Sequence, residues 1–301
     1  MKNELFTNHG NSTTGLIGLG LMGGALGGRL LAKGCRVLGF DIAAAAAAAF
    51  RKTGGLTAAG ASEVFSVCDT VLLSLPSDLE VNAVLRTATG SFRKGQVILD
   101  TTTGDPDSAQ ILARDLALQE VEYLDATISG NSDQARQGQA LWMVGGTRAA
   151  FEGCAELFRI LADQTIHTGR SGTGAKMKLV TNLVLGLNRA ALAEGLAFAE
   201  SLGLDLRQTL EVLGSSMAYS RIMDTKGEKM IQGNFHPQAR LSQHLKDVRL
   251  MLDAAAQAGL TLPLSETHRR LMERAEAAGL GELDNSAIIE VLRKTRSAPQ
   301  L

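Results

Sequence analysis

The chain has 301 residues, 45% of them hydrophobic and 20% charged, and its formal net charge is −1. This length allows one large domain or two of ordinary size, and the near-neutral charge argues against nucleic acid or an anionic membrane surface as a partner. No stretch reaches the roughly 20 unbroken apolar residues of a membrane helix. Residues 1–13 are polar and lack the apolar core of a signal peptide, so we interpret them as a flexible leader.

Apolar runs and helix-forming segments alternate through the first half of the chain. Strands are expected at 14–19, 36–40, 56–58, 70–75, 96–100, 121–126 and 141–146. Helices are expected at 22–33, 42–52, 61–67, 78–87, 107–118 and 148–161. This alternation predicts an α/β domain over residues 14–170, a Rossmann-type doubly wound parallel sheet.

The strand pattern stops near residue 170, and helical segments follow. They are expected near 174–202, 205–214, 217–231, 240–259, 263–279 and 284–294. Residues 171–301 therefore predict an all-helical domain for substrate binding and oligomerisation. Its apolar surface exceeds what one small domain needs to bury, which favours a homo-oligomer, a homodimer or a homotetramer.

The helix that joins the two halves carries an unusual stripe of polar residues. Most of its surface is apolar, so we expect it to be buried on most sides. At about 100° per residue, four polar side chains fall within a stripe about 40° wide. They are Lys178, Asn182, Arg189 and Glu200. The stripe is either the solvent-facing side of the helix or a site of chemistry, and the helix alone does not decide between them.

A glycine motif follows the first predicted strand. Gly18, Gly20 and Gly23 form G-x-G-x-x-G between a strand and a helix, and Asp41 ends the second strand. This context predicts dinucleotide binding, with the pyrophosphate at the helix N-terminus and the acid on the adenine ribose. NAD(H) is favoured over NADP(H), because Asp41 would repel a 2′-phosphate and no arginine follows it before Arg51. The expected cofactor loop is Gly18, Leu19, Gly20, Leu21, Met22 and Gly23.

Three later strands end in polar segments, at 73–78, 99–106 and 125–134. In an open α/β sheet, ligands lie beyond the carboxyl ends of the strands. These segments offer an apolar wall for a cofactor, hydroxyls near a nicotinamide, and N–H groups suited to a carboxylate. The residues expected there are Leu75, Pro76, Thr102, Thr103, Ser129 and Gly130.

Taken in order, these segments resemble the β-hydroxyacid dehydrogenases, the family of 3-hydroxyisobutyrate dehydrogenase and tartronate semialdehyde reductase. The resemblance runs from about residue 15 to 290 and rests on several blocks. They are GLIGLGLMGGALGGRLLAKG, DTTTGDP, DATISG followed by MVGG, GTGAKMKLVTN, and HLKDVRL. It implies the catalytic lysine at Lys178, not Lys176, and the substrate-binding asparagine at Asn182. It also implies Thr103 and Lys246 beside the cofactor, Asp247 behind Lys246, and Ser129 and Gly130 on the substrate carboxylate.

Some positions depart from the family pattern. Asn131 replaces the second glycine of S-G-G, and Thr181 replaces the first asparagine of the lysine motif. These positions belong to the substrate site implied by the resemblance, together with Asp247. An amide at position 131 either binds an extra substrate hydroxyl or narrows the pocket, and the sequence leaves both readings open.

We therefore expect hydride transfer between NAD(H) and a small 3-hydroxy acid or its semialdehyde, with Lys178 as acid and base. A sugar-acid dehydrogenase of the L-threonate type, a semialdehyde reductase and a non-catalytic nucleotide-binding protein are the alternatives. The three cysteines are widely spaced, which favours reduced thiols in a cytoplasmic protein. The histidines have no metal-ligand spacing, so no metal is expected.

Overall fold

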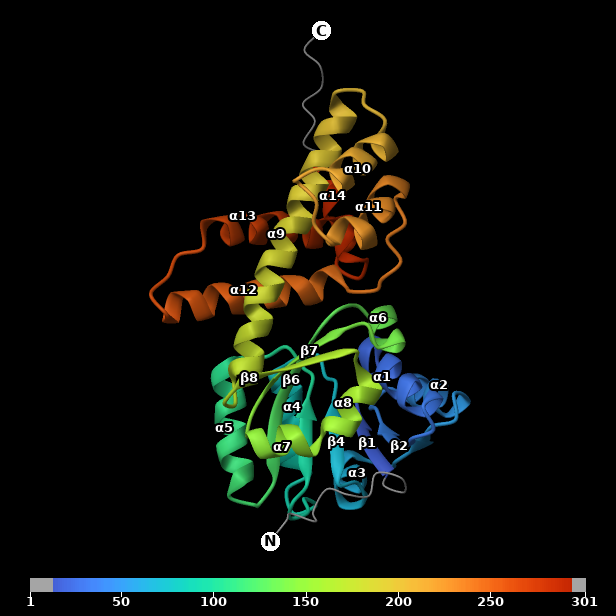
Figure 1. Cartoon of the computed structure of the whole chain (residues 1–301), viewed down its shortest axis with the longest axis vertical. Helices are drawn as coiled ribbons and strands as arrows, with labels where there is room; N and C mark the ends of the chain where they lie inside the picture. Colours follow the sequence, from blue (N-terminus) through green and yellow to red (C-terminus); the bar gives the residue numbers. More distant parts are fainter. Residues whose placement is uncertain (1–12, 294–301) are drawn as a thin grey trace. The chain divides into compact units, whose positions relative to one another are not determined.

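The computed structural model describes residues 13–293, which leaves nearly all of the predicted leader outside the described residues. The described residues form two compact units that divide between Lys178 and Leu179, one α/β and one helical (Figure 1). No helix within residues 13–293 combines the length and the hydropathy needed to cross a bilayer.

The α/β unit is built on one sheet in the order β3-β2-β1-β4-β5-β6-β7-β8. Its strands are β1 (Thr13–Ile17), β2 (Arg36–Phe40), β3 (Leu56–Thr57), β4 (Thr70–Leu73), β5 (Val97–Asp100), β6 (Glu122–Ser129), β7 (Leu141–Gly145) and β8 (Gln164–Gly169). The doubly wound, mostly parallel sheet is confirmed, with one departure from the expected parallel pairing, since β7 pairs antiparallel to β6. Residues 130–140 are too short for a parallel crossover, which needs about a dozen or more residues.

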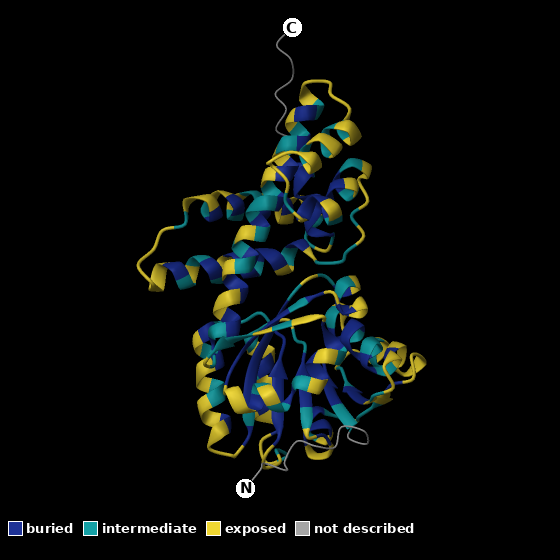
Figure 2. Ribbon diagram, in the orientation of Figure 1, coloured by how far each residue is buried: buried dark blue, intermediate teal, exposed yellow. Residues whose placement is uncertain are grey.

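Helices cover both faces of this sheet, because alternate strand residues point to opposite sides. Leu16 lies in one core with α1 (Leu21–Ala32), α2 (Ala44–Lys52), α6 (Ser132–Gln137), α7 (Arg148–Gly153) and α8 (Ala155–Leu161). Ile17 lies in the other core with α3 (Ala61–Val67), α4 (Asp78–Thr87) and α5 (Pro106–Ala117). Figure 2 shows the central strands buried between partly exposed helices.

Three elements of this unit differ from expectation. The helix expected at 148–161 is two helices, α7 and α8, because the backbone at Cys154 leaves the helical conformation. The short helix α6 and the edge strand β8 were not predicted. Both are brief and polar, so their sequences carry little hydrophobic periodicity.

The second unit is helical, as expected. Its elements are α9 (Thr173–Ser201), which begins in the first unit, α10 (Leu206–Ser215), α11 (Ile222–Gln232), α12 (Leu241–Gln257), α13 (Pro263–Ala275), the π-helical turn η2 (Glu276–Leu280), the 3-10 turn η3 (Asn285–Ile288) and α14 (Ile289–Arg293). Its core contains Leu196 of α9, Met230 of α11, Leu245 of α12 and Met272 of α13, all fully buried.

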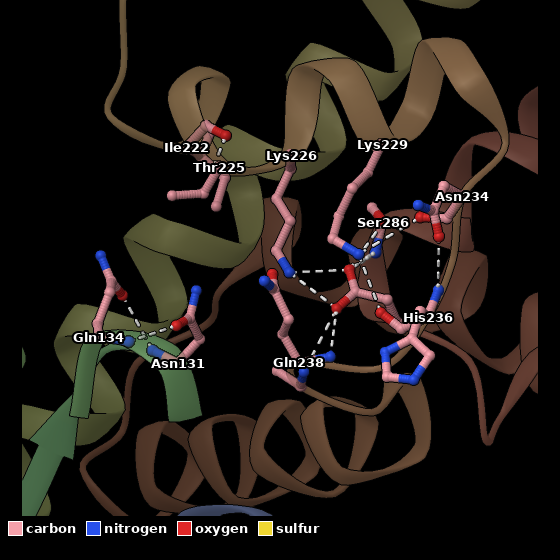
Figure 3. A network of polar contacts seen from close by, with 12 residues as sticks. Asn131, Gln134, Ile222, Thr225, Lys226, Lys229, Asn234, His236, Gln238 and Ser286 are labelled. Atoms are coloured by element: carbon pink, nitrogen blue, oxygen red, sulfur yellow. Dashed lines mark hydrogen bonds and ion pairs between the residues drawn. The ribbon is translucent and has the colours of Figure 1, made fainter. Parts of the chain in front are cut away.

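A buried ion pair holds the end of this unit together. Both oxygens of the Asp284 carboxylate accept hydrogen bonds from Lys226 Nζ at 2.8 Å. The same carboxylate accepts the backbone N–H groups of Gln238 and Ala239 and the hydroxyl of Ser286. Figure 3 shows Lys226, Gln238 and Ser286 among the residues of this polar network. One acid therefore joins α11, the loop before α12, and η3.

The surface of α9 differs from that of an ordinary amphipathic helix, because its buried side holds polar as well as apolar residues. Lys178, Asn182 and Arg189 are 9%, 5% and 1% exposed, so the reading of the polar stripe as the solvent-facing side is wrong. On the opposite side, apolar residues are exposed, so the expectation of burial on most sides is also wrong there. The most exposed are Val180 at 58%, Val184 at 52% and Phe198 at 63%, and Leu202, the first residue after the helix, is 59% exposed.

Candidate functional site

The glycine loop has the backbone that a dinucleotide needs. Gly18 has φ +92°, and a Cβ there would lie 2.2 Å from the carbonyl oxygen of Ser74. A Cβ at Gly23 would lie 1.9 Å from the carbonyl oxygen of Gly18. At Gly20, by contrast, a Cβ would meet nothing within 4 Å. The outer two glycines are therefore required by packing within the protein, and the middle one borders open space.

The first turn of α1 follows Gly20, and the first N–H groups of a helix have no acceptor within the helix itself. Gly20 is its N-cap and supplies no side-chain acceptor, and the first turn carries no acid. A helix N-terminus of this kind binds anions through its N–H groups and dipole, so the loop fits a pyrophosphate. Leu19 is buried, Leu21 is exposed and Met22 packs against the core.

Asp41 connects the end of β2 to this loop. Its Oδ2 accepts the backbone N–H of Leu19 and its Oδ1 accepts that of Ala43, both at 2.7 Å. A carboxylate has about four lone-pair sites, so each oxygen retains one for a ribose hydroxyl. Arg51, the first arginine after Asp41 in the sequence, donates a hydrogen bond from its guanidinium to Thr57 Oγ1.

The ends of β4 and β5 are joined by a hydrogen bond. The N–H of Leu75 donates to Thr102 Oγ1 at 3.2 Å, and Thr102 is 7% exposed. That hydroxyl therefore contacts the neighbouring strand, whereas Thr103 is only half-buried and Pro76 is exposed. Thr103 is the better candidate for a ligand contact.

Strand β6 fixes the start of α9 through residues that sequence reasoning had assigned no role. The Asp125 carboxylate accepts the N–H groups of Gly172 at 2.8 Å and Ala175 at 2.9 Å. Thr127 Oγ1 donates to the carbonyl of Gly174 at 2.9 Å. Burial raises the pKa of Asp125, and the N–H groups that it accepts oppose that rise. The acid in DATISG was visible in the sequence, but its partners lie about fifty residues away.

Lys178 lies one turn further along α9. Its Nζ donates to the carbonyl oxygen of Ile128 at 2.5 Å. The amine is thereby held at the carboxyl end of β6, beside the half-buried Ser129 and the exposed Gly130. Gly130 has φ +153°, and a Cβ there would lie 2.8 Å from that of Ala140, so the position requires glycine. The structure thus brings the predicted lysine and the predicted carboxylate site together.

A second buried acid lies on the neighbouring strand. Tyr123 donates its hydroxyl to Asp100 Oδ2 at 2.6 Å, and both residues are buried. Burial raises the pKa of Asp100 to about 6, although hydrogen bonds from Tyr123 and Thr102 oppose the rise. Asp100 begins the DTTTGDP block, yet nothing in the sequence indicates its tyrosine partner.

The remaining predicted residues lie in the helical unit. Asn182 Nδ2 donates to Asp247 Oδ2 at 2.9 Å. The Nζ of Lys246 lies 3.4 Å from Asp247 Oδ1, and the lysine side chain is 28% exposed against 8% for the acid. Asp247 therefore contacts both Asn182 and Lys246 from a buried position, and its contact with Asn182 was not foreseen from the sequence.

Two family models together match nearly the whole chain. Residues 13–169 match the NAD binding domain of 6-phosphogluconate dehydrogenase, and residues 172–292 match the model described as NAD-binding of NADP-dependent 3-hydroxyisobutyrate dehydrogenase. Sequence relatives include 2-(hydroxymethyl)glutarate dehydrogenase of Eubacterium barkeri, 33% identical over 92% of this chain and 93% of that protein. Another is 2-hydroxy-3-oxopropionate reductase of Escherichia coli, 31% identical over 92% and 96%. A similar solved structure is 3-hydroxyisobutyrate dehydrogenase from Salmonella typhimurium, with TM-score 0.86 and 27% identity over 93% and 100%.

Proposed function

The chain belongs to the β-hydroxyacid dehydrogenase family, and we propose that it transfers a hydride between NAD(H) and a small 3-hydroxy acid or the corresponding semialdehyde. Three relatives that are at least 30% identical to it are two dehydrogenases and a reductase, and the chain is an oxidoreductase that acts on a CH–OH group. The observation that carries the proposal is the Lys178 amine held at the end of β6, beside Ser129 and Gly130.

The chemistry divides between the cofactor and the protein. Bound NAD+ supplies the hydride acceptor. Lys178 accepts the proton of the substrate hydroxyl during oxidation and returns one to the carbonyl during reduction. Ser129 and the backbone N–H at Gly130 hold the substrate carboxylate, which orients the reacting carbon.

The helical unit contributes the other proposed groups. Asn182 binds the substrate, and its amide is oriented by the hydrogen bond to Asp247. Lys246, held by the same acid, contributes to cofactor binding. In the α/β unit, Thr103, Leu75 and Pro76 flank the nicotinamide.

A substrate panel tests the reaction. Purified protein with NAD+ is given 3-hydroxyisobutyrate, 3-hydroxypropionate, L-threonate and glycerate, and NADH formation is followed by absorbance. Semialdehydes with NADH test the reverse direction. Turnover of at least one 3-hydroxy acid or semialdehyde is expected. If neither series is turned over with NAD(H) or NADP(H), the proposed reaction is wrong.

Cofactor choice depends on Asp41. Its carboxylate lies where the adenine ribose is expected and would repel a 2′-phosphate. Replacing Asp41 with Asn removes the charge and a charge-assisted hydrogen bond, so the ratio of kcat/KM for NAD+ over NADP+ is expected to fall about 10- to 100-fold. Initial rates with both cofactors measure it. Asp163→Asn, an exposed change in the same unit, is the control, and an unchanged ratio in Asp41→Asn would contradict the assignment.

We also propose that the chain forms a homodimer or homotetramer through α9. At about 100° per residue, Val180, Val184, Phe198 and Leu202 lie within about 40° of one another, which places exposed apolar side chains on one side of the helix in two groups. The double variant Val184→Glu, Phe198→Glu is expected to be monomeric by light scattering, since it places charges on that side. Gln208→Glu is the matched control. A monomeric wild-type protein would refute this part of the proposal.

The three free cysteines of the described residues support a reducing, cytoplasmic location.

A further inference from the structure

Two amide side chains at the start of α6 form a reciprocal pair. Asn131 Oδ1 accepts the backbone N–H of Gln134 at 2.9 Å, and Gln134 Oε1 accepts the backbone N–H of Asn131 at 3.0 Å. This is a capping box in which amides replace the usual hydroxyl and carboxylate. Because both amide oxygens are engaged by the backbone, the orientation of both amides is determined.

The amide nitrogens of Asn131 and Gln134 take no part in the capping box, and both are hydrogen-bond donors. The Asn131 Nδ2 and Gln134 Nε2 groups each carry two N–H bonds. Within residues 13–293, no acceptor receives a hydrogen bond from either nitrogen, and both residues are half-buried. Figure 3 shows the two nitrogens on the same side of the pair. The pair therefore offers clustered N–H donors, and each amide oxygen retains one lone pair beside the backbone N–H that it already accepts.

This donor pair lies close to the reactive amine along the chain. Lys178 Nζ is bonded to the carbonyl of Ile128, three residues before Asn131. Three extended residues span at most about 10 Å, so the backbone of Asn131 lies within about 10 Å of the residue that holds the amine. Gln134 Oε1 would lie 3.2 Å from a Cβ at Gly130, so the pair borders the proposed carboxylate site directly.

We propose that Asn131 and Gln134 bind a hydroxyl that the substrate carries in addition to its carboxylate and its reacting hydroxyl. This inference rests on the proposed function and narrows it to polyhydroxy acids. Of the two readings that the sequence left open for position 131, it selects the extra hydrogen bond, because the amide oxygen is held by the backbone N–H of Gln134 and the nitrogen is the group left to bind a ligand.

The local charges favour a neutral oxygen over a second carboxylate. The pair itself is uncharged. The nearest charged side chains on α6 are Asp133 and Arg136, which are exposed and lie 3.4 Å from each other. Arg136 is matched by that acid, and the other cation packed against α6, Arg29 of α1, donates to the carbonyl oxygens of Ile160 and Arg136 at the C-terminal end of the helix, away from the capping box.

The test compares two acids that differ by one hydroxyl, 3-hydroxybutyrate and 3,4-dihydroxybutyrate. Asn131→Ser removes the amide donors but retains a side-chain acceptor for the N-cap. Gln134→Glu removes the other donors but keeps the accepting oxygen. Gln137→Glu makes the same change at an exposed position on the same helix and serves as the matched control. Melting temperatures check that the capping box survives.

The wild type is expected to prefer the dihydroxy acid. That preference, the ratio of the two kcat/KM values, is expected to fall about 3- to 10-fold in Asn131→Ser and in Gln134→Glu, as for loss of a neutral hydrogen bond. Gln137→Glu keeps the wild-type ratio. Calorimetric Kd values for both acids in the presence of NADH give a second readout that does not need turnover.

The outcomes separate the two proposals. The subsite is overturned, while the proposed function stands, if the variants turn over both acids with the wild-type ratio of kcat/KM values and also keep the wild-type ratio of the two Kd values. Absence of turnover with every acid overturns the proposed function, and the Kd difference still decides the subsite. If 3-hydroxyglutarate is preferred and the variants abolish that preference, the subsite binds a second carboxylate, and the hydroxyl assignment is wrong.

Discussion

Replacing Lys178 with methionine is expected to lower kcat by a factor of about 10² or more, because the variant has no group to exchange a proton with the substrate oxygen. Methionine retains most of the apolar stem of lysine, so the packing around this 9% exposed residue changes little. NADH binding, followed by fluorescence titration, is expected to remain near the wild-type value. The cofactor loop belongs to a different part of the α/β unit.

Lys176 provides a matched control for this experiment. It lies two residues earlier on the same helix, and its side chain is exposed. Lys176→Met is therefore expected to retain wild-type kcat. A small primary amine added to Lys178→Met is expected to restore part of the rate, because it can carry the missing proton. Full turnover by Lys178→Met on the true substrate would remove the lysine from the mechanism.

Replacing Asp284 with alanine is expected to destabilise the helical unit by about 3–5 kcal/mol, since it leaves the buried ammonium of Lys226 without a counter-charge. Lys226 is 4% exposed and Asp284 is fully buried. The loss also removes the acceptor for the backbone N–H groups of Gln238 and Ala239. Thermal unfolding followed by circular dichroism is expected to show a decrease in Tm of roughly 10 °C.

A second variant separates the charge from the packing. Lys226→Met in the Asp284→Ala background removes the unpaired ammonium, so part of the lost Tm is expected to return. A Tm of Asp284→Ala equal to that of the wild type would show that the pair does not hold the unit together.

The pKa of Asp284 predicts how the stability of the protein changes at low pH. Burial opposes ionisation of Asp284, but Lys226 and the hydrogen-bond donors around it outweigh burial and lower its pKa to about 2. An unfolded aspartate titrates near 3.9. The stabilisation is therefore complete above about pH 4 and is lost as the pH falls toward 2. The wild-type Tm is expected to decline over that interval more steeply than the Tm of the Asp284→Ala variant.

Much of the α/β unit could be predicted because its signals are local. The strand Arg36–Phe40 and the helices Ala61–Val67 and Asp78–Thr87 match the expected boundaries to the residue. The last of these is preceded by Ser77, whose hydroxyl caps it by accepting the N–H of Leu79. Apolar runs and capping residues act over a few positions, so a sequence displays them directly.

The direction of β7 and the existence of β8 could not be predicted in the same way. A strand's direction depends on the length and path of its connection, and an edge strand of mixed polarity such as Gln164–Gly169 is stabilised by the strand it joins. The break at Cys154 likewise interrupts a segment whose composition suits one continuous helix.

By itself, the sequence determined the spacing of the glycines, the acid eighteen positions later, and the order of the blocks around Lys178, because motif chemistry depends on neighbours along the chain. Only the tertiary structure decided that the polar stripe of α9 is buried, that Asp125 and Ile128 hold its first turns, and that the amide oxygen of Asn131 is occupied. Burial and the choice of hydrogen-bond partner are set by the packing of distant segments. For α9, those partners on β6 lie about fifty residues away in the chain.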